Sequence, residues 1–297
     1  MPGMKNPGVA AAAGTRRSLL EIHAAVLLFG FPGLFAKWLP LPPQAIVFGR
    51  VVFAALALAA VLALTRRSLA ITPRRDLALL VLCGLILAVH WSLFFKSVQV
   101  SSVAVGLLAY SSFPVFTVLL EPLAFHERLE LRSLAWAGLC LLGVFLIVPR
   151  FTAADAVFRG VVWGLLAGLT FACLTLLNRG LARRQSSLAV AFYQDLFAAL
   201  FLVPFAAGSV ASFSGRTIGL LLILGVFGTA AAHTLFIGGM RHVPARTASI
   251  ISSLEPVYGI VLALAFLREI PTPRTVVGGA VVMAAALAVT LDARRAA

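Results

Sequence analysis

Residues 111–127 read SSFPVFTVLLEPLAFHE, and residues 253–269 read SLEPVYGIVLALAFLRE. When the two stretches are aligned without a gap, a Pro-Val pair and a closing Glu coincide at an offset of about 142 residues. The match continues outward, because Arg132 falls on Arg274. The chain therefore contains an internal repeat, and this repeat decides the expected fold.

Long apolar segments fill both copies of the repeat. Hydrophobic residues make up 61% of the 297 residues and charged residues 11%, whereas soluble domains have about 45–50% and 25%. This composition excludes a soluble enzyme and a disordered chain. A membrane-spanning helix needs about 20 mainly apolar residues. Ten windows qualify: 21–38, 44–64, 77–96, 101–121, 133–149, 159–179, 187–206, 217–240, 246–266 and 274–291.

The ten windows divide into two repeats of five, at residues 21–149 and 159–291. An odd number of spans places the second repeat upside down relative to the first. The sequence thus predicts an all-α integral membrane protein of ten transmembrane helices in two inverted five-helix repeats. Inverted repeats are typical of secondary transporters, whose binding site lies near the membrane midplane between the repeats.

The net charge of +14 comes from 24 Lys and Arg against 10 Asp and Glu. The basic residues are scattered in short loops and concentrate in alternate loops, as the positive-inside rule requires. They therefore indicate a multi-pass protein of the cell inner membrane with both termini cytoplasmic, and no nucleic-acid partner. The three cysteines lie inside apolar segments, so no metal site or disulfide framework follows.

Prolines mark weak points in three predicted spans. Pro114 and Pro256 lie within equivalent spans of the two repeats, and Pro32 lies in the first span beside Gly30 and Gly33. A proline inside a helix removes a backbone hydrogen bond and frees a carbonyl. Each is either a tolerated kink or a bend that shapes a cavity or gate.

Charged residues within the spans are expensive and need a partner or a function. Arg50 and Asp195 lie in equivalent spans with opposite signs, so a structural pair between them is one interpretation. Asp195 is alternatively a proton carrier. Glu255, beside Pro256, either bonds freed backbone or meets a substrate amino group or a proton.

Polar and aromatic residues within the spans are the candidates for substrate binding, since small-molecule sites are mostly apolar with a few polar groups. Ser, Asn and His donors would hold a zwitterion, and large rings would surround its side chain. Packing inside a helix bundle and anchoring at the membrane interface are the alternatives for each residue. The candidates are His90, Trp91, Tyr110, Ser111, Ser112, Trp163, Asn178, His233, Ser252, Ser253 and Tyr258.

Three glycines, Gly160, Gly164 and Gly168, fall on one face of the sixth predicted span. Small residues at four-residue spacing let helices approach closely. A close structural contact is the first interpretation, and a surface that slides during transport is the second.

The two Pro-Val to Glu blocks, Pro114 to Glu127 and Leu254-Glu255-Pro256-Val257 to Glu269, resemble the ten-helix EamA group of the drug/metabolite transporter superfamily. The resemblance covers residues 21–291. It implies two inverted bundles around a central cavity, lined mainly by the first, third, fourth, sixth, eighth and ninth spans. Within the group the chain is most similar to the YddG branch, which exports aromatic and other neutral amino acids.

The function expected from these observations is export of small metabolites, foremost amino acids, by alternating access. Efflux of drugs or quaternary ammonium compounds, with or without proton coupling, is the alternative. The sequence contains no nucleotide-binding Gly-x4-Gly-Lys-Ser/Thr motif and no Gly-x-Ser-x-Gly or His-Glu-x-x-His enzyme motif. We therefore expect no enzymatic activity and no cofactor or metal. The expected partners are a small-molecule substrate and the lipid bilayer, and the expected oligomeric state is a monomer.

Overall fold

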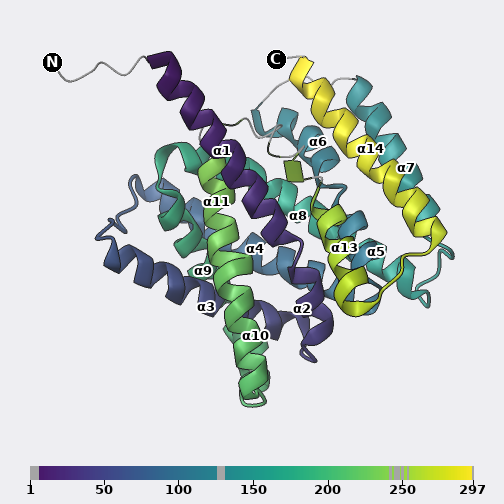
Figure 1. Ribbon diagram of the computed structural model, residues 1–297, viewed down its shortest axis with the longest axis horizontal. Helices are drawn as coiled ribbons and strands as arrows, with labels where there is room; N and C mark the ends of the chain where they lie inside the picture. The colour runs from purple at the N-terminus through teal and green to yellow at the C-terminus, as the bar shows by residue number, and fades with distance from the viewer. Residues whose placement is uncertain are drawn as a thin grey trace.

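The computed structural model describes residues 7–125, 131–240, 243, 248, 251–252 and 254–295, and every regular element within them is a helix (Figure 1). The elements are α1 (Pro7–Phe29), α2 (Pro32–Trp38), α3 (Pro43–Leu64), α4 (Arg74–Val100), α5 (Val103–Tyr110), α6 (Phe113–Phe125), α7 (Leu131–Ile147), α8 (Ala156–Arg184), α9 (Ser187–Val210), α10 (Gly215–Gly225), the π-helix η1 (Val226–Ala231), α11 (Ala232–Gly239), α13 (Glu255–Leu267) and α14 (Pro273–Arg295).

Seven helical segments are long and apolar enough to cross a membrane, among the residues that the structure describes: Arg16–Trp38, Pro43–Leu64, Arg74–Val100, Val103–Glu121, Ala156–Arg184, Ser187–Val210 and Gly215–Gly239. Three shorter apolar helices, Leu134–Ile147, Glu255–Leu267 and Pro273–Ala288, fall in the remaining predicted windows. The prediction of an all-helical integral membrane protein is confirmed. Ten complete spans and their inversion stay predictions.

The three prolines do not lie within continuous helices, contrary to the expectation for Pro114 and Pro256. Each sits in the first turn of a new helix, since α2 begins at Pro32, α6 at Phe113 and α13 at Glu255. Proline is favoured at the start of a helix because the first N–H groups have no intrahelical acceptor. The spans around Pro32 and Pro114 are therefore broken just before the proline rather than bent at it.

A helix irregularity that the sequence does not signal interrupts the eighth predicted window. The π-helix η1 lies between α10 and α11. In a π-helix each backbone N–H bonds to the carbonyl five residues earlier instead of four. The Thr229 hydroxyl donates to the Leu224 carbonyl at 3.0 Å. This bond occupies one of the backbone acceptors that the wider helical turn leaves free.

Side-chain caps fix where several helices begin. Ser102, Asp155, Ser186 and Ser214 precede α5, α8, α9 and α10, and each accepts a hydrogen bond from the backbone N–H three residues later. Such caps satisfy donors that would otherwise be unpaired at the helix start.

Helices far apart in sequence make the bundle. α4 packs against α8 and α9, α3 against α9 and α10, and α1 against α11. α7 and α14 pack on each other and lie side by side at one edge of the molecule (Figure 1). α1 begins and α14 ends at the same edge, the top in Figure 1.

The three glycines of α8 face α5 and the end of α4. A Cβ added to Gly164 would lie 2.6 Å from the Ala109 Cβ, and one added to Gly168 would lie 2.9 Å from the Tyr110 carbonyl oxygen. One added to Gly160 would overlap Ser101. The helices thus approach at a distance that only glycine allows, and the Ser97 hydroxyl uses this closeness to donate to the Gly160 carbonyl at 2.6 Å.

We expect Gly164→Ala to destabilise the protein although alanine is the better helix former. The added methyl group would push α8 away from Ala109, and overpacking of this kind costs about 1–3 kcal/mol. The thermal unfolding midpoint of purified protein in detergent measures the change. Gly138→Ala in α7 is the matched control, because nothing lies within 4 Å of the added atom; it should leave the midpoint unchanged or raise it. Equal midpoints for the two variants would contradict the close approach.

Candidate functional site

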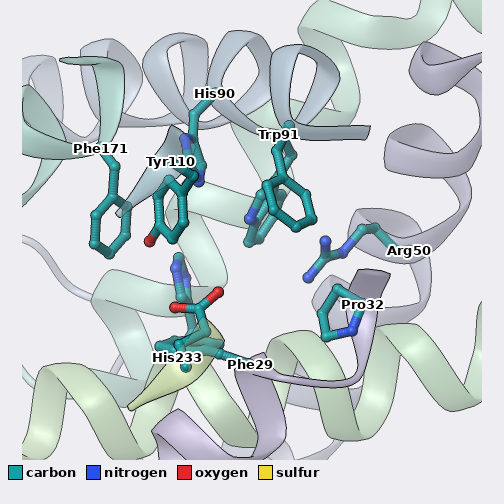
Figure 2. A pocket seen from close by; sticks show the side chains of 10 residues that line it. Phe29, Pro32, Arg50, His90, Trp91, Tyr110, Phe171 and His233 are labelled. Atoms are coloured by element: carbon teal, nitrogen blue, oxygen red, sulfur yellow. The ribbon is translucent and has the colours of Figure 1, made fainter. Parts of the chain in front are cut away.

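A cavity lies where helices from both halves of the chain meet. Figure 2 shows its walls, with side chains from α1, α2, α3, α4, α5, α8, α11 and α13. Apart from α3, these elements lie in the first, third, fourth, sixth, eighth and ninth spans, which the family resemblance implies as the lining of the cavity. α3 belongs to the second span and is an addition to that set. The lining residues are Phe29, Pro32, Arg50, His90, Trp91, Phe94, Tyr110, Phe171, His233 and Glu255.

The cavity is small in this conformation. It leaves about 30 Å³ for the centres of water molecules, and one water needs about 10–15 Å³ on that scale. The space therefore suits about two water molecules. A metabolite can enter only if the surrounding side chains or helices move apart.

Aromatic rings form most of the wall. The ring centroid of Phe171 lies 5.1 Å from that of His90 and 5.4 Å from that of Tyr110, and the ring centroids of Trp91 and His233 lie 5.2 Å apart. These spacings are typical of stabilising ring pairs. The cavity thus offers large apolar surfaces to a ligand, with Trp91 and His233 bringing α4 and α11 together.

The two cavity histidines differ in their hydrogen bonding. His90 Nδ1 lies 2.9 Å from the Ala167 carbonyl oxygen. Since a carbonyl only accepts, Nδ1 carries the proton, which leaves Nε2 of the neutral ring as an acceptor. His233 Nδ1 is buried, and no group in the described part of the chain bonds to it. The site therefore has one oriented imidazole and one with a free ring nitrogen.

Arg50 reaches the cavity from α3 and is 1% exposed. Its Nε donates to the Thr229 hydroxyl at 2.9 Å, and its Nη2 donates to the Gly228 carbonyl at 3.0 Å. The guanidinium carbon lies 3.9 Å from the centroid of the Trp91 ring. Arg50 therefore joins α3 to η1 and packs on α4, while its Nη1 has no hydrogen-bond partner among the described residues.

The structure does not place Arg50 in a hydrogen bond with Asp195. Asp195 is fully buried in α9, close enough to Arg50 to feel its charge, and neither carboxylate oxygen has a hydrogen-bond partner in the part of the chain that is described. The guanidinium is instead engaged by η1, whose irregular backbone the sequence does not reveal. The neighbouring Gln194 donates to the Asn178 side-chain carbonyl at 2.5 Å. Neither Asn178 nor Asp195 is among the residues that line the cavity.

Other predicted substrate residues also lie away from the wall. The Ser111 and Ser112 hydroxyls donate to carbonyls of their own helix, at Leu107 and Ala109. Trp163, Ser252 and Tyr258 are described, yet they are not among the lining residues, and neither are Pro114 and Pro256. Ser253 lies outside the described residues. Of the predicted substrate residues, the structure brings His90, Trp91, Tyr110 and His233 together around one space.

The sequence gives no sign of three further lining residues, Phe29, Phe94 and Phe171. The chain has 22 phenylalanines, most of them in apolar segments, so residue type does not separate cavity from lipid-facing positions. No group of three or more His, Cys, Asp or Glu suited to a metal occurs among the described residues.

The chain was compared with known families and proteins. The sequence profile of the EamA-like transporter family matches twice, at residues 17–148 and 158–291. The "Uncharacterized transporter YxxF" of Bacillus subtilis is 28% identical over 283 residues, covering 94% of this chain and 90% of that protein. The "Uncharacterized inner membrane transporter YicL" of Salmonella typhimurium is 25% identical over 95% and 97% of the two chains.

The chain is also similar to an exporter and to a solved structure. The "Pseudopaline exporter CntI" of Pseudomonas aeruginosa is 26% identical over 84% of this chain and 87% of that protein. A solved crystal structure aligns over 96% of this chain and 98% of its own, with a TM-score of 0.67 and 20% sequence identity, which shows a shared fold. The two profile matches cover most of the sequence, and the relatives named here are transporters. This chain belongs to the EamA-like transporter family.

Proposed function

We propose that this membrane transporter exports small metabolites, foremost aromatic and other neutral amino acids, across the cytoplasmic membrane by alternating access. The observation that carries the proposal is the small cavity between the two halves, with aromatic walls and one charged residue of each sign. A cavity of this kind can hold a small amphipathic ligand away from both aqueous compartments. Opening it to one side and then to the other moves the ligand across the bilayer.

The inverted arrangement of two five-span repeats, at residues 21–149 and 159–291, is part of the proposal. The contacts between helices support it, because they recur when the halves are exchanged. The third span, α4, packs on the sixth, α8, and the equivalent pair, α11 of the eighth span and α1 of the first, also pack together. Likewise α4 packs on α9 of the seventh span, and α10 of the eighth span packs on α3 of the second. α7 and α14, the last spans of the two halves, pack on each other.

The proposed topology places both termini in the cytoplasm and needs only one chain. The basic loops favour this orientation, and the common edge of α1's start and α14's end in Figure 1 agrees with an even number of crossings. Because each chain carries both halves of the cavity, a monomer suffices for transport.

Export is the direction supported by one relative, whose printed name describes a pseudopaline exporter. The YddG-like branch assignment rests on the motif resemblance. Aromatic rings at the wall, among them Trp91, Tyr110 and Phe171, are compatible with apolar and aromatic side chains.

Efflux of organic cations is the alternative, and Glu255 in an aromatic cavity favours it. Cations bind well to aromatic faces beside a carboxylate. The same cavity, however, contains the Arg50 guanidinium, which already stacks on Trp91 and repels a second cation. This arrangement makes a singly charged cation the weaker candidate.

Transport should appear as saturable uptake of labelled neutral amino acids into proteoliposomes that hold the purified protein. Trp91→Ala should lower the rate roughly tenfold, which corresponds to about 1.4 kcal/mol, because a main wall of the cavity is lost. Trp163→Ala is the matched control and should stay near the wild-type rate, since Trp163 does not line the cavity. Absence of saturable uptake for every amino acid would refute the proposed substrate class.

Thiol labelling tests the inverted topology. In a variant lacking the native cysteines, cysteines introduced at Arg66 and Arg216 should react with a membrane-impermeant reagent from opposite sides of the membrane. The proposal places the loop after the second span in the cytoplasm and the loop after the seventh span outside. Labelling of both positions from the same side would contradict the inversion.

Proton coupling, where present, should depend on Asp195. This carboxylate is buried in α9 without a hydrogen-bond partner among the described residues, and an unpaired buried charge is costly, so it is the candidate to take up a proton. Asp195→Asn keeps the shape and removes the proton site. We expect the variant to retain exchange of labelled for unlabelled substrate while losing any stimulation by an imposed pH gradient. Full stimulation of the variant would exclude Asp195 as the coupling site.

A further inference from the structure

We infer that the cavity is a binding site for a zwitterion, in which Arg50 binds the carboxylate of an α-amino acid and Glu255 binds its ammonium group. This inference rests on the proposed function and adds the two recognition contacts to it. It also moves recognition away from the serines and Asn178 expected from the sequence, since these lie outside the cavity wall.

Arg50 has a fixed orientation and one unused edge. Two of its nitrogens are engaged by Thr229 and Gly228, and its guanidinium carbon lies over the Trp91 ring, 3.9 Å from the ring centroid. Nη1, by contrast, is buried without a hydrogen-bond partner among the described residues, although the side chain lines the cavity. A buried donor without an acceptor is costly, so this nitrogen is available to a ligand oxygen. Charge-assisted bonds from a guanidinium to a carboxylate are among the strong hydrogen bonds in proteins.

Glu255 supplies the complementary charge. It lies in the first turn of α13, is 6% exposed and lines the same cavity as Arg50. None of the hydrogen bonds or ion pairs formed between described side chains involves its carboxylate. The carboxylate is therefore free to accept from an ammonium group.

The two charges share one cavity without forming an ion pair with each other. Arg50 comes from α3 in the first half and Glu255 from α13 in the second half, and the bonds from Arg50 to η1 hold the guanidinium in place. Had the two side chains met, each would have neutralised the other. Held apart, each of them leaves a site for one charge of a ligand.

Charge complementarity then decides which ligands fit. A zwitterion offers a partner to both cavity side chains when it enters, whereas an amine leaves Arg50 with the charge of Asp195 alone and a simple carboxylate leaves Glu255 unmatched. An unmatched charge in a water-poor site is strongly unfavourable. The remaining wall, with Tyr110, Phe94 and Phe171, is aromatic. The ligand class is therefore an α-amino acid with an uncharged, apolar or aromatic side chain.

Three ligands that share a phenyl ring test the inference: phenylalanine, phenethylamine and 3-phenylpropionate. Their dissociation constants are measured with purified wild-type protein in detergent. We expect phenylalanine to bind about tenfold or more tightly than either of the others, as the loss of one charge-assisted contact implies.

The variant Glu255→Gln should remove the preference for the ammonium group. Phenylalanine affinity should fall about tenfold, while 3-phenylpropionate should bind as well as before or better. Glu121→Gln is the matched control, because it makes the same change at the end of α6, where Glu121 pairs with Arg179 outside the cavity. This control should keep the wild-type order of the three ligands.

The variant Arg50→Gln should show the opposite selectivity, losing 3-phenylpropionate and keeping phenethylamine. Because Arg50 also ties α3 to η1, the wild-type series and Glu255→Gln decide the inference without it.

The outcomes separate this inference from the proposed function. Equal binding of phenylalanine and phenethylamine by the wild type, or an unchanged ligand order in Glu255→Gln, would overturn zwitterion recognition even where amino-acid uptake is observed. Tightest binding of phenethylamine would overturn it in favour of the organic-cation alternative. Absence of binding and of uptake for every amino acid would overturn the proposed function together with the inference.

Discussion

The buried guanidinium of Arg50 is the constraint around which the centre of this protein is arranged. An arginine within the hydrocarbon region is expensive unless it is paired or solvated. Here the hydroxyl of Thr229, the carbonyl of Gly228 and the face of Trp91 replace its water shell. The π-helix provides that carbonyl, and Gly225 brings the helices close, since a Cβ there would lie 2.6 Å from the Arg50 carbonyl oxygen. The irregular backbone and the charge therefore stabilise each other.

In the proposed inverted arrangement, equivalent positions of the two halves carry different chemistry. At the repeat offset of about 142 residues, Trp91 corresponds to His233, and the centroids of these two rings lie 5.2 Å apart. Arg50 corresponds to Phe192, which does not line the cavity. In that arrangement, equivalent spans surround the central space, while the differences between the repeats give its two sides different side chains. A fully symmetric cavity would offer the same group twice and could not distinguish the two ends of a ligand.

The sequence predicted the fold class because apolar segments of about 20 residues have few alternatives to membrane helices. It failed at Pro114 and Pro256, because sequence shows that a proline disturbs a helix and not whether a new helix starts there. His90, Trp91, Tyr110 and His233 were predictable as rare polar or amphipathic groups in apolar segments. Phe29 and Phe171 were not, because only tertiary packing distinguishes them from lipid-facing phenylalanines. Arg50 was expected to be structural. Only the structure shows that η1 engages two of its nitrogens and that Nη1 has no partner among the described residues.

The contacts at the two ends of the bundle differ in kind from those around the cavity. At the start of α4, Asp76 accepts from Arg184 at 2.9 Å, and at the other end Lys37 donates to the Ser101 carbonyl at 3.0 Å. Arg184 is half-exposed and Lys37 is exposed, whereas Asp76 is 1% exposed and accepts from two nitrogens of Arg184. The interior, by contrast, depends on ring packing and on buried hydrogen bonds, which are costly to lose. In the proposed alternating access, movement would therefore break contacts of two kinds: charged contacts that reach water at the ends, and buried contacts at the centre. The π-helix η1 lies directly beside the guanidinium, and π-helical turns are frequent at functional sites, so the irregular backbone and the proposed binding group occupy the same part of the bundle.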